Sequence, residues 1–199
     1  MAGQQSLVRW MARSLAIVLV AGLAAVSTGA GAAGAAPALG KFASQARAAG
    51  LDSAQAGVLQ GRVDAYLRQV GGVQTAANEI RVGDGVTLTL TLPGEQRVRD
   101  LTSGATGKGV VAAAAPRDCP SLTFCAYRNT DLTGDRIDAY HCYIVYNMPW
   151  YGYGSWANNQ SQGTLARLEG QNGGVLYYSF AYEQYYDFNW GPIWYIDPC

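Results

Sequence analysis

The sequence has few ionisable side chains and only one histidine. Its 199 residues include 14 Lys and Arg against 14 Asp and Glu, so the formal net charge is zero. A protein that binds nucleic acid through its phosphates normally carries a basic excess, which is missing here. We therefore expect no nucleic-acid partner, and other partners must be recognised by local surfaces.

The chain also lacks an apolar run at its start that is long enough to span a bilayer. The run Ser14–Val26 follows Arg9 and Arg13 and is well short of the roughly 20 residues that a spanning helix needs. Small residues follow it, with candidate cleavage positions in Ala30–Ala36. This order is typical of a secretory signal peptide at residues 1–36, and a retained anchor is the alternative. We predict a secreted, extracellular protein that has no membrane partner once the signal is removed.

No Cys-x-x-Cys pair occurs, which argues against a structural zinc site. The four cysteines are Cys119, Cys125, Cys142 and Cys199, an even number that suits disulfides in an exported protein. Four cysteines allow three pairings. We favour Cys119 with Cys125, which closes the short loop CPSLTFC, and Cys142 with Cys199, which ties the last residue to the middle of its domain. Zinc binding is the competing use of these residues.

Aromatic residues are almost absent from the first half of the mature chain and frequent in the second. In residues 37–101 only Phe42 and Tyr66 are aromatic, whereas twelve of the 13 tyrosines follow residue 117. The stretch 102–117 between them is small and nearly uncharged, which suits a linker. We therefore predict a first segment at 37–101, a linker at 102–117 and an acidic, aromatic domain at 118–199.

The segment 37–101 has the pattern of a helix followed by a β-hairpin. Asp52 and Gln55 have the spacing of a capping box, and apolar residues then recur at helical spacing until Gly71-Gly72. After Gly83-Asp84-Gly85, apolar residues alternate with threonines, which indicates a hairpin. We predict a small α+β unit in which a two-stranded hairpin packs on the helix. Its sequence carries no recognisable chemistry.

The domain 118–199 has short apolar stretches separated by Gly, Asn, Asp and Pro, which indicates an all-β fold. Within Phe124–Gly134 the aromatic Tyr127 is followed by Leu132 and Gly134. This pattern resembles the folded hairpin of βγ-crystallin Greek keys. In that hairpin an aromatic ring packs across the turn, and the glycine adopts a backbone angle that other residues avoid.

The order of the motifs extends this resemblance to a family. The cysteine pair and the hairpin are followed by YGYGSWANN, a shorter unit ARLEGQNGGVLYY and a last cysteine. In this order they are similar to secreted bacterial βγ-crystallin-like peptidase inhibitors, a family that inhibits metalloproteases. The resemblance covers Cys119 to Cys199 and implies a disulfide-stapled Greek-key β-sandwich. It also implies that a rigid surface loop occupies the cleft of an extracellular metalloprotease.

The sequence departs from the family pattern in two places. Calcium sites of βγ-crystallins use paired Asn or Asp followed by Ser or Thr. That segment is missing between Tyr153 and Gly154, and the equivalent segment of the second unit reads Asn189–Ile193. We therefore expect no calcium, no other metal and no cofactor. The second hairpin has Arg167 or Leu168 where an aromatic is expected, and a reactive bond cannot be transferred to a numbered residue.

The stretch MPWYGYGSWANN, Met148–Asn159, holds four aromatic rings and no charged side chain. Trp156 falls on a predicted strand and is expected in the core. Trp150, Tyr151 and Tyr153 precede it on a glycine-rich connection and are our predicted binding residues. Rings on a short loop offer a large contact area at low entropic cost, which suits a protease or the stacking of a cell-wall glycan. A glycan-binding, antimicrobial module is therefore the alternative function.

A catalytic site has little support in the sequence. His141 stands alone beside Cys142 and is predicted to be structural or exposed. Asp131, Asp135 and Asp138 are expected to flank turns, where capping is the ordinary role of aspartate, although two of them would suit a glycosidase. We predict that the protein is not an enzyme, with a hydrolase as a third alternative.

Overall fold

The computed structural model describes residues 41–101 and 119–199. The predicted signal peptide, its cleavage positions and the predicted linker 102–117 lie outside these residues. All of the described residues belong to one unit by their mutual contacts. Neither of the two helices that the structure describes is both long and apolar enough to cross a membrane.

Strands β4 to β11 form two antiparallel Greek keys that exchange one strand each. The first key contains β4 (Thr123–Asn129), β5 (Thr133–Ala139), β6 (Tyr146–Asn147) and β7 (Tyr153–Asn159). The second contains β8 (Leu165–Glu169), β9 (Val175–Phe180), β10 (Gln184–Asn189) and β11 (Tyr195–Asp197). Strand β6 joins the sheet of the second key, in the order β6-β11-β8-β9, and β10 joins β7 in the sheet of the first key. This arrangement confirms the predicted Greek-key sandwich.

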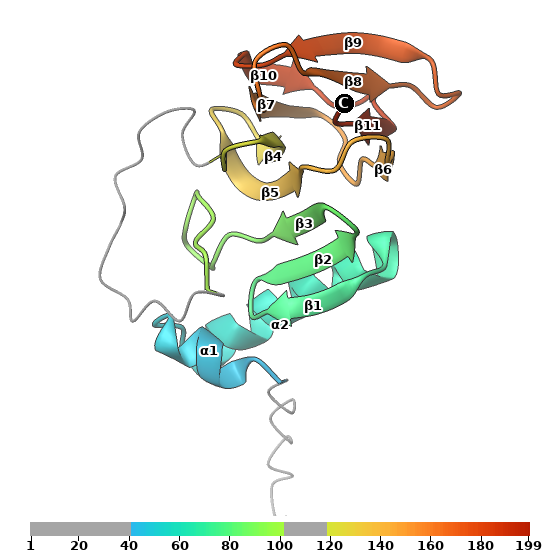
Figure 1. The fold of residues 1–199 in the computed structure, drawn as a ribbon. Helices are drawn as coiled ribbons and strands as arrows, with labels where there is room; N and C mark the ends of the chain where they lie inside the picture. The colour runs from blue at the N-terminus through green and yellow to red at the C-terminus, as the bar shows by residue number, and fades with distance from the viewer. Residues whose placement is uncertain (1–40, 102–118) are drawn as a thin grey trace, which may run out of the picture. The chain divides into compact units, whose positions relative to one another are not determined.

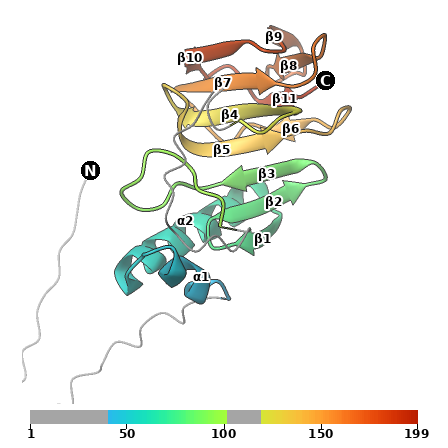
Figure 2. The same ribbon diagram turned by 60° about the vertical axis from the view of Figure 1, so that its left-hand side comes forward.

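The larger sheet continues into the first segment of the chain. Strands β1 (Val73–Ala76), β2 (Glu79–Gly83) and β3 (Val86–Thr89) form an antiparallel meander, and β3 pairs with β5. Figure 2 shows the resulting row of seven strands, in the order β1-β2-β3-β5-β4-β7-β10. The predicted hairpin is present as β2 and β3, and β1 adds a strand that we did not predict. Chain on both sides of residues 102–117 thus builds one sheet.

Two helices precede these strands, α1 (Ala43–Ala48) and α2 (Ser53–Val70). The predicted capping box starts α2: Gln55 N donates to Asp52 Oδ1 at 2.8 Å, and Asp52 N donates to Gln55 Oε1 at 3.0 Å. The helix ends before Gly71, whose φ is +73°. Helix α2 runs along β1 and β2 (Figure 1) and buries the face formed by Ala56, Leu59, Val63 and Tyr66.

One apolar core extends from α2 through the meander into both sheets of the sandwich. Trp156 is fully buried in this core, as expected from the sequence. Its ring contacts four other aromatic rings, those of Phe124, Tyr177, Tyr185 and Phe188. These rings come from both sheets and pack around Trp156 between the two Greek keys, with Tyr185 at the edge of the cluster, where it is 44% exposed.

The folded hairpin lies between β4 and β5, as predicted. Tyr127 and Leu132 are both buried, and Gly134 has a φ of +83°. A side chain at this glycine would also collide with Asn129. Ser155 fixes the hairpin, because its Oγ accepts from Leu132 N at 2.9 Å and donates to the Asn129 carbonyl at 2.6 Å.

The structure contains two disulfides, Cys119–Cys125 and Cys142–Cys199, in the pairing that we favoured. The first closes a short loop in front of β4. The second joins the segment before β6 to the residue that follows β11. Their presence is consistent with an oxidising compartment outside the cytosol.

Two glycine substitutions test the packing of this fold. A Cβ atom at Gly154 would lie 2.5 Å from the Tyr127 carbonyl oxygen and still closer to Trp190 Nε1, two atoms that share a 3.0 Å hydrogen bond. Gly154→Ala should therefore lower the free energy of unfolding by about 2 kcal/mol or more, measured by urea denaturation.

The matched control is Gly61→Ala in α2, where a Cβ atom would meet nothing within 4 Å. Alanine is the better helix former, so this variant should gain about 0.5–1 kcal/mol. Equal stability of the Gly154→Ala variant and the wild type would contradict the packing of β7 against Trp190.

Candidate functional site

The three predicted binding residues divide between the core and the surface. Trp150 is 4% exposed, whereas Tyr151 and Tyr153 are 68% and 65% exposed. All three lie on or beside the connection between β6 and β7. The connection thus has one ring turned inward and two turned to solvent, and the three do not form one surface patch. We call residues 148–153 the aromatic loop.

Helix α2 holds the aromatic loop at two adjacent points. Trp150 Nε1 donates a hydrogen bond to Tyr66 Oη at 2.9 Å. Gln69 Nε2 donates to the carbonyl oxygen of Pro149 at 2.9 Å. Tyr66 and Gln69 are three residues apart, so they lie on the same face of the helix. The first segment of the chain therefore anchors a loop of the sandwich.

A buried carboxylate supports this anchor from below. Asp135 in β5 accepts hydrogen bonds from Tyr66 Oη at 2.9 Å, Thr91 N at 3.0 Å and Thr91 Oγ1 at 3.1 Å. The guanidinium of Arg62 forms an ion pair with it, and Arg128 Nη1 lies 3.7 Å from its Oδ2. An unpaired buried carboxylate would strongly destabilise the fold. Here two arginines and three hydrogen bonds compensate the burial of the charge.

The hydroxyl group of Tyr66 joins the carboxylate to the loop. It donates to Asp135 and accepts from Trp150 Nε1 and from Arg128 Nη1, the latter at 3.0 Å. Burial, followed by the negative charge of Asp135, raises the pKa of Tyr66 to about 12, against opposing effects of Arg128 and Trp150. The hydroxyl therefore keeps its proton at neutral pH and can serve as donor and acceptor at once.

An open hollow of about 280 Å³ lies next to this network. Its wall is formed by Tyr66, Gln69, Arg128, Pro149, Trp150 and Tyr151. We had not predicted the parts played by Tyr66, Gln69 and Arg128. In the sequence Tyr66 is one more position of an apolar helical stripe, and no local pattern links α2 to a strand some 60 residues later.

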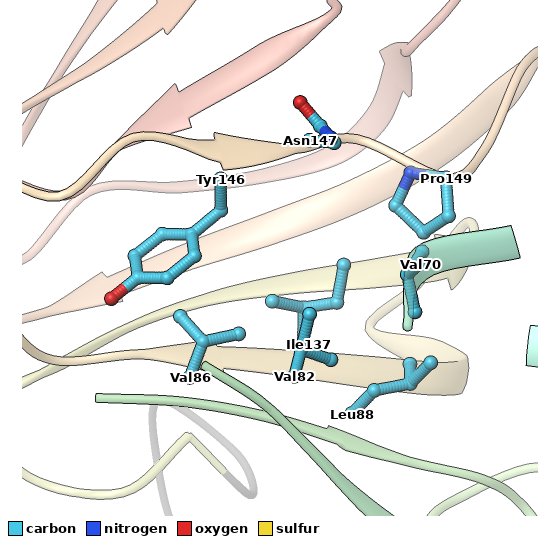
Figure 3. A pocket seen from close by; sticks show the side chains of 8 residues that line it. All are labelled: Val70, Val82, Val86, Leu88, Ile137, Tyr146, Asn147 and Pro149. Atoms are coloured by element: carbon cyan, nitrogen blue, oxygen red, sulfur yellow. The ribbon is translucent and has the colours of Figure 1, made fainter. Parts of the chain in front are cut away.

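A second cavity lies inside the core and is apolar. Figure 3 shows the side chains that line it, among them Val86, Ile137 and Tyr146. Its volume is about 10 Å³, room for one water molecule at most. This cavity is a packing defect between the meander and β6, so the hollow beside the aromatic loop is the better candidate for a binding site.

The candidate catalytic carboxylates do not come together in a working pair. Asp131 lies in the turn of the folded hairpin, whereas Asp135 and Asp138 lie within β5, so the expectation that these two flank turns is wrong. Residues three apart in a strand face opposite sides of the sheet. Asp138 is paired with Arg136, Oδ1 to Nε, at 2.6 Å. Its burial raises its pKa and the arginine opposes this effect.

His141 and Asn189–Ile193, the segment equivalent to a βγ-crystallin calcium site, both make contacts within the protein. His141 Nδ1 lies 3.3 Å from Asp84 Oδ2 at the turn between β2 and β3. In the segment Asn189–Ile193, Asn189 Oδ1 accepts from Gly191 N at 2.9 Å and Trp190 is buried. Within 41–101 and 119–199, no three His, Cys, Asp or Glu side chains are grouped so that they could hold a metal ion.

The Tyr66 hydroxyl provides a test of the anchor. Tyr66→Phe leaves Trp150 Nε1 and one Asp135 oxygen without this partner in a buried place, so the free energy of unfolding should fall by about 1–3 kcal/mol at pH 7. The folded-state pKa is raised above the unfolded value of 10.0, so this stability is present below pH 10 and is lost as the pH rises toward 12.

The measurement is urea denaturation of both proteins between pH 7 and pH 11.5. The stability difference should shrink by about 2 kcal/mol as the pH approaches 12, which is most of the free-energy equivalent of the raised pKa. The other tyrosines titrate in both proteins, so the difference isolates Tyr66. A difference that stays constant with pH would contradict the buried, carboxylate-bonded hydroxyl.

No curated protein and no solved structure matches the chain. Residues 112–161 match the model of peptidase inhibitor family I36. The matched residues are about a quarter of the chain and include the whole first Greek key, β4 to β7, together with the aromatic loop. The match therefore supports a peptidase inhibitor family for this chain and confirms the resemblance inferred from the sequence.

Proposed function

We propose that the protein is a secreted inhibitor of an extracellular metalloprotease and is not itself an enzyme. The observation that carries this proposal is the match of residues 112–161 to a family of peptidase inhibitors. The match includes the aromatic loop, which is the part of the first Greek key that combines exposed rings with a buried anchor. We therefore assign target binding to this loop.

The proposed mechanism rests on the rigidity of the aromatic loop. The hydrogen bonds of Trp150 and Pro149 to α2 hold the loop before any partner arrives. Tyr151 and Tyr153 are then free to bury their rings against the target. A loop that is already ordered loses little conformational entropy on binding. It should therefore bind the protease more tightly than a flexible substrate does.

Secretion is supported by two independent features. The start of the sequence has the charge, apolar run and small residues of a signal peptide. The two disulfides of the sandwich would form and persist in an oxidising compartment. An inhibitor in this location would meet extracellular proteases.

A second candidate function, binding of cell-wall glycans, has its own observation. Exposed rings also occur away from the aromatic loop, on β9, β10 and the turn between them: Tyr178, Phe180, Tyr182, Tyr185 and Tyr186. Exposed aromatic rings are suited to stacking on the apolar faces of sugars. Binding of the protein to peptidoglycan or chitin would favour this second function, with the exposed rings as the stacking surface.

The exposed tyrosines of the loop give the test. The chain without residues 1–36 should inhibit a thermolysin-type metalloprotease at a near-stoichiometric ratio. Tyr151→Ala combined with Tyr153→Ala should weaken inhibition by about 2 kcal/mol or more, because large aromatic anchors often contribute this much at interfaces. Both rings are exposed, so the melting temperature should change little.

The matched control is Tyr178→Ala combined with Tyr182→Ala, which removes two exposed tyrosines from the other end of the sandwich. This variant should inhibit as the wild type does. Failure of the wild type against metalloproteases and trypsin-type serine proteases alike, together with retention on insoluble polysaccharide, would replace the inhibitor proposal with glycan binding.

A further inference from the structure

We propose that the hollow beside the aromatic loop is a subsite for a carboxylate of the target protease, with Arg128 as its cationic ligand. This inference rests on the proposed function and adds the chemistry that the site recognises. It also gives the first segment of the chain a role, because α2 forms one wall of the subsite.

Arg128 presents an available guanidinium to the hollow. Its Nη1 donates to Tyr66 Oη at 3.0 Å and lies 3.7 Å from Asp135 Oδ2. Its Nη2 and Nε have no hydrogen bond to any residue within 41–101 and 119–199. The side chain is 54% exposed, so these remaining donors are accessible. A guanidinium fixed at one nitrogen and open at the others is suited to a carboxylate, which accepts two parallel hydrogen bonds.

The local charge favours an anion. Arg62 and Arg128 both approach the single carboxylate of Asp135, so this group of three carries a net charge of about +1 at neutral pH. Asp135 is fully buried and is satisfied by Tyr66, Thr91 and Arg62. The uncompensated charge is therefore on the exposed side, at Arg128.

The walls of the hollow suit an acidic side chain on a peptide. Gln69 and the backbone of the aromatic loop are polar, whereas the exposed ring of Tyr151 offers apolar surface to the methylenes of a glutamate. The volume of about 280 Å³ is at the low end for ligand sites, which corresponds to one side chain better than to a large ligand.

The position of the hollow indicates a protein as the source of the carboxylate. Arg128, Pro149, Trp150 and Tyr151 all lie within the residues that match the peptidase inhibitor family. The hollow is also continuous with the aromatic loop, because Tyr151 belongs to both. A protease that contacts Tyr151 would cover Arg128 at the same time, and an acidic residue at that place would gain a charge-assisted hydrogen bond.

Two small probes test the subsite without any protease. The carboxylate of N-acetyl-glutamate amide should shift the NMR signals of the Trp150 indole N–H and the Tyr151 amide at millimolar concentration. N-acetyl-glutamine amide, its neutral isostere, should not. Arg128→Gln should abolish the shifts, and Arg128→Lys should retain part of them because it keeps the charge without the planar fork. Equal responses to both probes, or none to either, would overturn the subsite.

Inhibition kinetics then test its use. Arg128→Gln should weaken inhibition of the metalloprotease by about tenfold, as expected for loss of a charged hydrogen bond. Arg68→Gln is the matched control, since it removes the same charge from an exposed position of α2 that does not line the hollow, and it should leave inhibition unchanged. If Arg128→Gln is folded and inhibits as the wild type does, the subsite proposal is wrong even though the inhibitor proposal stands.

The two proposals can fail separately. If the wild type inhibits no protease but binds the glutamate probe through Arg128, the inhibitor proposal is wrong and the carboxylate specificity of the hollow stands. If the NMR spectrum shows that Arg128→Gln alters the fold, Arg128→Lys is used to test the subsite instead. Inhibition by this variant equal to that of the wild type, at both low and high salt, would contradict a bidentate contact between Arg128 and a carboxylate.

Discussion

The hydroxyl group of Tyr66 is the contact on which the arrangement of the site depends. It joins three parts of the chain that are distant in sequence: helix α2, the buried Asp135 of β5 and the Trp150 of the aromatic loop. Two of its partners, Asp135 and Trp150, are buried, so loss of the hydroxyl would leave their polar atoms unpaired at a substantial energetic cost. The pairing of β3 with β5 brings α2 to this place, since the helix lies on β1 and β2.

This contact explains why adjacent aromatic residues have different roles. Trp150 is used inside the molecule as a hydrogen-bonded anchor, and Tyr151 is left outside beside the hollow. The first segment of the chain, for which the sequence suggested no function, supplies two hydrogen-bond partners of the loop, Tyr66 and Gln69, beside those that Trp190 and Trp194 supply from the sandwich. In the proposed inhibitor, therefore, α2 acts as a support for the loop and as a wall of the carboxylate subsite.

Local patterns in the sequence predicted the local structure well. The capping box of α2 depends on residues three apart, and the folded hairpin depends on one ring and one glycine within eight residues. The Greek-key order also agrees with the structure, because it follows from a resemblance that preserves motif order, and so does the disulfide pairing, which was favoured from the positions of the cysteines in the sequence. The pairing of β3 with β5 could not be predicted, because the alternation of apolar and polar residues along a strand does not show which strands pair with one another or which lie at the edge of a sheet.

The burial of Trp150 was missed for a similar reason. Its immediate neighbours are a proline and a tyrosine, and nothing within the loop distinguishes its ring from that of Tyr151. Only the distant Tyr66 hydroxyl makes the difference. The hollow requires three segments that meet in space, so its residues had no shared signal in the sequence. Asp135 and Asp138 were expected beside turns because turn capping is the ordinary role of aspartate, whereas the hairpin strand β5 includes both.

Hydrogen–deuterium exchange of the protein alone and in complex with a metalloprotease would show directly whether the aromatic loop binds the protease. We expect strong added protection in peptides that contain residues 148–153 and the end of β4 at Arg128, and unchanged exchange in β8 and β9. Protection of β9 and β10 with none in the aromatic loop would contradict this expectation, because the binding surface would then lie on the opposite part of the sandwich.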